Sequence, residues 1–145
     1  MREEESTFTI DENGDKFWRN KEGELHRIDG PAAEYSDGRK EWHKNGKLHR
    51  IDGPAIEYGN GNKAWYQNGE RHRIDGPALE LTNGTKYWYQ NGVLHRIDGH
   101  AIEYRNGDKS WFYNNVKFHT KETFFEALSD EEKSIALFSE DFLNA

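Results

Sequence analysis

The sequence lacks cysteine altogether and is poor in apolar residues. Its 145 residues include no Cys and only three Pro, and 33% of them are hydrophobic. The absence of Cys excludes a disulfide framework and a thiolate metal site. No apolar run approaches the roughly 20 residues that a membrane-spanning helix needs, and the opening MREEESTF has no signal-peptide pattern. We therefore expect a cytoplasmic protein that has no membrane partner.

The chain also lacks the basic excess of a duplex-DNA-binding protein. Its formal net charge is −7, and acidic residues concentrate near both ends. Residues 1–12 carry five acidic side chains and one basic one, whereas residues 120–145 carry seven acidic and two basic ones. General DNA binders normally show a basic stripe, so duplex nucleic acid is excluded as a partner. The middle of the chain, which is rich in Arg and His, leaves room for a small anion.

What the sequence has instead is one motif written four times. The pentapeptide HRIDG recurs with a step of 23 residues, at 26–30, 49–53, 72–76 and 95–99. Tryptophans keep the same step at Trp42, Trp65, Trp88 and Trp111, and Trp18 is one residue out of phase. A fixed period of this length is typical of repeat architectures, in which neighbouring units stack on one another.

Each repeat predicts a β-hairpin followed by a structured loop. Runs such as AIEY at 55–58 and KAWYQ at 63–67 favour strands, and a turn such as Asn60-Gly61 separates them. The return segment NGxxHRIDGP is expected to be a loop of about ten residues. In this loop we expect Asp52 to cap backbone N–H groups and Gly53 to take a left-handed conformation. Two strands per repeat give about ten strands in all.

The pattern changes to helix after Thr120. The segment TKETFFEAL is expected to be helical, and Ser129 with Glu132 predicts a capping box for DEEKSIALF. The helices should cover the open C-terminal end of the sheet. The expected apolar stripe on these helices consists of Ile135, Phe138 and Phe142.

The predicted fold is mainly β: an elongated antiparallel β-hairpin repeat array with a 23-residue period and a C-terminal α-helical cap. We expect an acidic tail at residues 1–6, the repeat array at 7–119 and the cap at 120–145.

The repeat unit, in which YxNGxxH leads through a loop into DGPAxEYxxG, resembles the MORN repeat family. It is more similar still to the variant HRxDGPA repeats of bacteriophage and giant-virus proteins. The resemblance covers about residues 7–119, and Arg replaces the usual Gly of the MORN loop in all four copies. The resemblance implies a β-hairpin array used for interactions, often in viral accessory proteins, and it implies no catalytic residues.

The residues themselves predict a binding protein rather than an enzyme. The pattern HxxD recurs, but catalysis needs one asymmetric site, and here every candidate occurs in the same setting four times. No nucleophile elbow, phosphate-binding Gly loop or HExxH motif is present. His49 and Asp52 are possible metal ligands by type, yet equivalents in neighbouring repeats would lie ~10 Å apart, too far to share an ion. We expect no metal and no cofactor.

The candidate binding residues are those that repeat in rows. The Trp row is expected to be core, and the second aromatic row is the better contact surface, since Tyr is enriched in interfaces. The Arg and His rows are expected along a loop edge; alternatively, HRIDG is scaffold alone, with Arg50 and Asp52 supporting each other. The candidates are Arg27, Arg50, Arg73, Arg96, His49, His72, His95, Tyr66, Tyr89 and Phe112.

Two functions from different classes follow. The first is a phage or viral accessory protein that binds and blocks a host protein, as a counter-defence inhibitor in the host cytoplasm, because exposed Tyr, Trp and Arg are typical of protein interfaces. The second is a sponge that sequesters a small anionic nucleotide-type messenger, with Arg on the phosphates and rings stacked on the base. Association of identical chains through the sheet ends is a further expectation.

Overall fold

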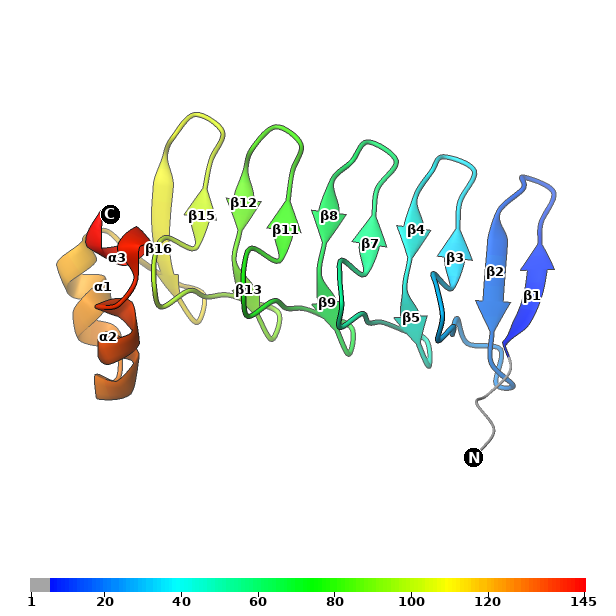
Figure 1. The fold of residues 1–145 in the computed structure, drawn as a ribbon, viewed down its shortest axis with the longest axis horizontal. Helices are drawn as coiled ribbons and strands as arrows, with labels where there is room; N and C mark the ends of the chain where they lie inside the picture. Colours follow the sequence, from blue (N-terminus) through cyan, green and yellow to red (C-terminus); the bar gives the residue numbers. More distant parts are fainter. Residues whose placement is uncertain (1–5) are drawn as a thin grey trace. The chain divides into compact units, whose positions relative to one another are not determined.

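The computed structural model describes residues 6–145, which are mainly β with three short helices at the C-terminal end (Figure 1). The expected fold class, antiparallel β-hairpins followed by helices, is confirmed. The chain divides into two compact units, Met1–Glu70 and Arg71–Ala145. The acidic tail expected at residues 1–6 lies outside the described residues except for Ser6, whose Oγ donates a hydrogen bond to the His26 carbonyl oxygen at 2.6 Å.

The first unit contains one antiparallel sheet and a smaller hairpin below it. The sheet has the strand order β1 (Thr7–Ile10), β2 (Lys16–Arg19), β3 (Ala33–Glu34), β4 (Lys40–Glu41), β7 (Ile56–Glu57) and β8 (Lys63–Ala64). The smaller hairpin consists of β5 (His43–Lys44) and β6 (Lys47–Leu48). Strand β9 (Tyr66–Gln67) follows, and β10 (Glu70–Arg71) spans the boundary between the units.

The second unit repeats this plan and adds the helices. Its sheet has the order β11 (Leu79–Glu80), β12 (Lys86–Tyr87), β15 (Ile102–Glu103), β16 (Lys109–Tyr113) and β17 (Val116–Phe118). Its smaller hairpin consists of β13 (Tyr89–Gln90) and β14 (Val93–Leu94). The helices are α1 (Lys121–Ala127), α2 (Asp130–Ala136) and α3 (Glu140–Leu143).

The expectation of about ten strands is wrong, because the described residues form 17. The return segment is not a single loop but begins with the smaller hairpin. Its turn is the Asn-Gly pair, in which Asn45 and Gly46 have φ values of 48° and 78°, as a two-residue type I′ turn requires. The main hairpins use a longer turn: Tyr35 N–H donates to the Arg39 carbonyl oxygen at 2.8 Å, and only Gly38 within it has a positive φ.

The tryptophan of each repeat connects the main sheet to the smaller hairpin. Trp42 N–H donates to the Ala55 carbonyl oxygen at 2.8 Å, and the Trp42 carbonyl oxygen accepts from His49 N–H at 2.9 Å. Trp18 and Trp88 make the equivalent pair of bonds. The backbone of Trp42 therefore belongs to neither ladder, which is why the strand KEWHK is divided into β4 and β5.

Small residues form the interior of each hairpin layer. Six alanines are fully buried, namely Ala32, Ala33, Ala55, Ala64, Ala78 and Ala101. A methyl side chain lets adjacent strands and loops approach closely, so the layers are thin and large rings are pushed outward. Most of the Trp rings are accordingly half-buried, and Trp111, which the helices cover, is buried.

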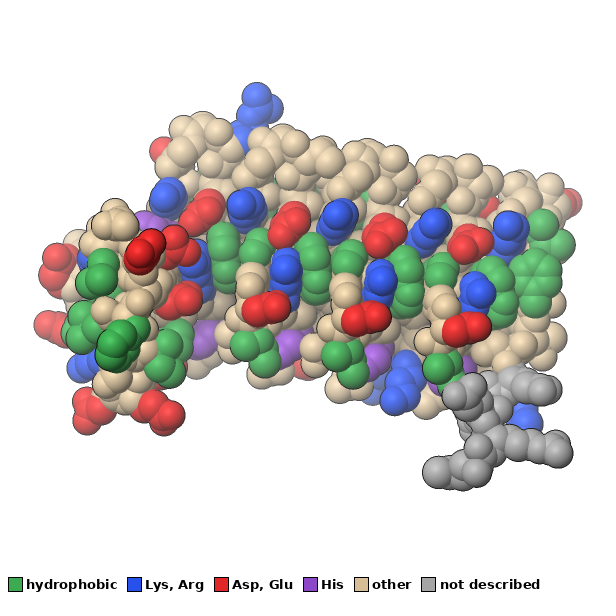
Figure 2. Space-filling model, viewed as in Figure 1, with side chains coloured by type: hydrophobic (Ala, Val, Ile, Leu, Met, Phe, Trp, Pro, Cys, Tyr) green, Lys and Arg blue, Asp and Glu red, His purple; other side chains and the backbone are tan. Residues whose placement is uncertain are grey.

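Lysine and glutamate alternate across each sheet, and Figure 2 shows basic and acidic side chains alternating on the face drawn. Lys40 pairs with Glu34 on one side and with Glu57 on the other, and Lys86 lies between Glu80 and Glu103 in the same way. Opposite charges on adjacent strands favour this register over a slipped one. Each exposed pair contributes little stability by itself, typically under ~1 kcal/mol.

The helices cover the last strands of the sheet, as expected. Helix α1 packs on β16 and β17, and the Phe124 ring stacks on Trp111 with centroids 4.7 Å apart. The predicted capping box between Ser129 and Glu132 is present. The predicted apolar stripe is wrong: α2 ends at Ala136, and Phe138 is 89% exposed although Phe142 on α3 is buried. None of the helices within residues 6–145 is long and apolar enough to cross a membrane.

We expect the substitution Phe124→Ala to lower the free energy of unfolding by ~3–5 kcal/mol, because it removes a ring that is fully buried between the sheet and the cap. The matched control is Phe138→Ala, which removes the same ring from an exposed position and should change stability by less than ~0.5 kcal/mol. Urea unfolding of both variants measures the difference. Equal losses would contradict the packing described for the cap.

Candidate functional site

The arginine of each HRIDG motif is held by three contacts within its own repeat. Arg50 Nε donates to Asp52 Oδ1 at 3.1 Å, and its Nη1 donates to the Pro54 carbonyl oxygen at 3.1 Å. Its guanidinium lies over the Trp42 ring, 3.9 Å from the ring centroid. Arg27 makes the same three contacts, with Asp29, Pro31 and Trp18. Such charge-assisted bonds and cation–π stacking fix the loop on the sheet.

The remaining letters of the motif fit around this guanidinium. A Cβ atom on Gly53 would lie 2.9 Å from Arg50 Cζ, so a larger residue there displaces the arginine. The expectation that Gly53 takes a left-handed conformation is wrong, because its φ is not positive. The expectation that Asp52 caps backbone N–H groups also fails within residues 6–145, where its carboxylate binds Arg50 instead. Close approach, and not backbone handedness, is the reason for this glycine.

The histidine of each motif accepts a hydrogen bond from the next two-residue turn, which is Asn-Gly for the first three motifs and Asn114-Asn115 for the fourth. His49 Nδ1 accepts from Asn68 N–H at 3.0 Å, and His26 Nδ1 accepts from Asn45 N–H at 2.9 Å. In the second unit, His72 and His95 accept in the same way from Asn91 and Asn114, at 3.0 and 3.1 Å. A ring whose Nδ1 accepts must be neutral with its proton on Nε2.

The surroundings of His49 and His95 oppose protonation of their rings. Burial lowers the pKa of His49, and the nearby Lys44 ammonium lowers it further. Burial also lowers the pKa of His95, although the Glu132 carboxylate acts in the opposite direction. The lowered pKa values keep the His49 and His95 rings in the neutral state that the hydrogen bond from the turn requires.

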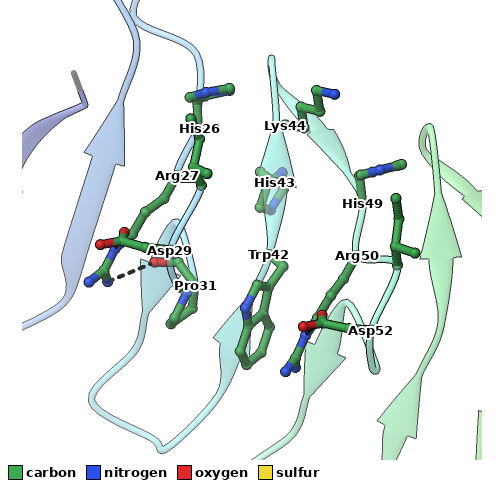
Figure 3. A pocket seen from close by; sticks show the side chains of 13 residues that line it. His26, Arg27, Asp29, Pro31, Trp42, His43, Lys44, His49, Arg50 and Asp52 are labelled. Carbon is green, nitrogen blue, oxygen red and sulfur yellow. Dashed lines mark hydrogen bonds and ion pairs between the residues drawn. The ribbon is translucent and has the colours of Figure 1, made fainter. Parts of the chain in front are cut away.

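A groove of about 730 Å³ lies in the first unit between the first and second HRIDG loops. Trp42 and His43 lie between the two loops, and Arg27 and Arg50 extend beside Asp29 and Asp52 (Figure 3). We call this cavity the loop groove. Its lining consists of His26, Arg27, Ile28, Asp29, Gly30, Pro31, Trp42, His43, Lys44, His49, Arg50, Ile51 and Asp52.

The loop groove is bordered by isoleucines that face solvent. Ile28 is 62% exposed and Ile51 is 80% exposed. The carboxylates of Asp29 and Asp52 are also exposed, whereas their partners Arg27 and Arg50 are largely buried. Isolated apolar side chains are common on surfaces. Two isoleucines, one from each loop beside a groove of this size, form a surface suited to an apolar ligand group.

His43 is a groove residue that departs from the aromatic consensus of the repeat. Equivalent positions hold Tyr66, Tyr89 and Phe112. His43 Nε2 lies 3.0 Å from Glu41 Oε2, and this hydrogen bond is the main reason that the pKa of Glu41 is lowered. The Nδ1 atom of His43 is buried and has no hydrogen-bond partner within residues 6–145.

The structure brings together three of the predicted site residues in the loop groove, namely Arg27, Arg50 and His49. In the second unit, Arg73 binds Asp75 and the Pro77 carbonyl oxygen, and Arg96 binds Asp98 and the His100 carbonyl oxygen. The predicted His72 and His95 lie at the turns described above.

The predicted aromatic row lies apart from the loop groove. Tyr66 on β9, Tyr89 on β13 and Phe112 on β16 are half-buried, and none of them lines the groove. Three groove residues, Ile28, Ile51 and His43, were not among the predicted site residues. The departure of His43 from the aromatic consensus was a usable signal for it. The two isoleucines gave none, because an apolar residue in a repeat is normally assigned to the core.

The groove carries charges of both signs and no recognisable metal site. Arg27 and Arg50 bind the carboxylates of Asp29 and Asp52, and Lys44 adds a third basic side chain to the lining. Within residues 6–145 no group of three His, Asp or Glu side chains could hold a metal ion. No protein-family model matches the chain, and no curated protein matches its sequence.

We expect Gly53→Ala to lower the free energy of unfolding by ~1–3 kcal/mol, because the new Cβ displaces the Arg50 guanidinium from its charged hydrogen bonds. The control is the same substitution in an Arg50→Ala background, where the penalty should disappear. Urea unfolding of the four proteins gives the coupling between the two sites. An equal penalty in both backgrounds would show that the glycine is needed for another reason.

We expect stability to fall as the pH is lowered from about 7.5 to about 5.5, above the range in which carboxylates titrate. The folded-state pKa values of His49 and His95 lie below the ordinary 6.5. The neutral rings therefore stabilise the fold fully above that value, and the contribution is lost as the pH falls toward the folded-state pKa. NMR titration of the rings tests the cause directly, and values at or above 6.5 for both would refute it.

Proposed function

We propose that the protein is a non-enzymatic interaction protein that binds a segment of a partner protein in the loop groove. The observation that supports this most is the exposure of Ile28 and Ile51 beside a groove of about 730 Å³. A cavity of that volume accommodates a few side chains of a bound segment, and exposed apolar residues beside paired charges are typical of interfaces.

The geometry favours a protein segment over a nucleotide. The Nε and Nη1 groups of Arg27 and Arg50 are already bound to carboxylates and carbonyl oxygens, so their charge is largely compensated. One face of the Trp42 ring is covered by the Arg50 guanidinium, which leaves that face closed to a stacked base. A nucleotide sponge would need free cations and open rings.

The wider biological role is part of the same proposal. The 23-residue period and the hairpin architecture support a MORN-like interaction module. We propose, on that resemblance, a viral accessory protein that binds and blocks a host protein in the host cytoplasm. A site built from repeated scaffold residues, with no asymmetric acid–base set, supports binding over catalysis.

The proposal predicts that Ile28→Ser/Ile51→Ser removes binding without removing the fold. Both side chains are exposed, so the double variant should retain the wild-type stability within ~0.5–1 kcal/mol. Loss of the apolar contacts should weaken binding of a partner by about tenfold or more. The immobilised chain is used to capture partners from cell extract, and each retained protein is then purified and its affinity measured.

The matched control is Ile10→Ser, which removes a 58% exposed isoleucine from β1, outside the loop groove. The control should bind as the wild type does. A partner whose affinity is unchanged in the double variant would refute the assignment of the groove. Release of a compound with the ultraviolet absorbance of a nucleobase, on denaturing the purified chain, would favour the sponge instead.

A further inference from the structure

The fourth HRIDG loop, unlike the first two, is covered by the C-terminal segment. Within the second unit, Ser139 Oγ donates to the Asp98 carbonyl oxygen at 2.9 Å, and Arg96 Nη2 donates to Asp141 Oδ2 at 2.6 Å. Ile97 packs against the cap cluster that includes Phe142. One short segment, Ser139–Phe142, thus binds the carbonyl oxygen and the guanidinium of the loop, and its Phe142 belongs to the cluster against which the loop isoleucine packs.

The side chains of the covered loop are less exposed than their equivalents in the first two loops, as expected for a surface that is bound. The Arg96 side chain is 7% exposed, whereas those of Arg27 and Arg50 are 24% and 22% exposed. The Asp98 side chain is 46% exposed, against 87% for Asp52. Ile97 is half-buried, whereas its equivalents Ile28 and Ile51 are exposed.

The same three features are present and uncovered in the first unit. Arg27 and Arg50 use Nε and Nη1 as Arg96 does, and within residues 6–145 their Nη2 groups have no partner. Similarly, no group in that part of the chain donates to the Asp29 or Asp52 carbonyl oxygens. The sequence of the loop, HRID, is identical in all these copies.

The floor of the loop groove also matches. In the second unit the Phe142 ring meets Trp111 edge-to-face, with centroids 5.9 Å apart. Trp42 occupies the position of Trp111 one repeat after the first loop, and it lines the loop groove. The groove therefore offers an aromatic side chain the same kind of neighbour that Phe142 has in the cap.

We propose that the loop groove binds a Ser-x-Asp-Phe segment of a partner protein, seated as Ser139–Phe142 is seated on the fourth loop. The hydroxyl donates to a loop carbonyl oxygen, the carboxylate accepts from an arginine Nη2, and the ring packs against Trp42 and the exposed isoleucine. An acidic segment suits a groove that has three basic and two acidic side chains. This inference rests on the proposed function, since it names the chemistry of the partner at that site.

The test uses a fluorescent peptide with the sequence of residues 137–145, LFSEDFLNA, and the full-length chain. We expect saturable binding in a fluorescence anisotropy titration, with perturbation of the Ile28, Ile51 and Trp42 NMR signals. Ile28→Ser/Ile51→Ser should weaken binding by about tenfold, and Ile10→Ser should leave it unchanged.

Matched peptides separate the specific contact from general charge. The change Asp141→Asn in the peptide removes the carboxylate that binds arginine and should weaken binding by about tenfold. The change Glu140→Gln removes the same charge one residue earlier and should alter affinity by less than about twofold. Equal effects of the two changes, or perturbation of Ile97 and Trp111 alone, would overturn the inference.

Failure of the inference is distinguishable from failure of the proposed function. A captured partner that depends on Ile28 and Ile51 but is not displaced by the peptide at about millimolar concentration refutes the Ser-x-Asp-Phe chemistry and leaves the groove assigned. Absence of both peptide binding and any partner sensitive to the isoleucines refutes the two together.

Discussion

The stacking of an arginine on a tryptophan is the interaction on which each repeat depends. The guanidinium of Arg50 covers the Trp42 ring and at the same time binds Asp52 and the Pro54 carbonyl oxygen. One side chain thus joins a loop to a sheet whose interior consists mainly of alanine, together with Ile56 and Ile102. A thin layer cannot gain enough from apolar burial alone, so a half-buried ring with a charged cover replaces the usual core.

This constraint explains four of the five residues of the HRIDG motif in physical terms. The aspartate orients the guanidinium, the glycine leaves space for it, and the histidine fixes the next turn through Nδ1. The isoleucine is the one letter with no such task in the first three repeats, where it is 62–80% exposed. A residue that repeats without a structural role is the part of the motif best explained by binding.

The repeat made the fold largely predictable from sequence, whereas the site was only partly so. The 23-residue period and the Gly turns are visible in the repeated sequence itself, and the Ser129–Glu132 capping box is visible in four consecutive residues of the cap. The smaller hairpins were missed because Asn45-Gly46 is a turn whose strands are two residues long, too short for alternation to show. The groove was missed because the exposure of Ile28 and Ile51 depends on how two loops are placed, which no local pattern reports.

Departures from the repeat mark the places where the scaffold contacts something else. His100 stands where the other loops have proline; its ring lies 3.9 Å from that of Trp111, beneath the cap, and burial with nearby cations lowers its pKa to about 4. It is therefore a neutral packing residue at neutral pH, in ring contact with the tryptophan on which Phe124 of α1 also stacks. His43 is the corresponding departure in the first unit, where it lines an open groove and has a buried Nδ1 without a partner in the described chain. The departures at His43 and Lys44 both line the loop groove, the surface on which we propose that the partner segment binds.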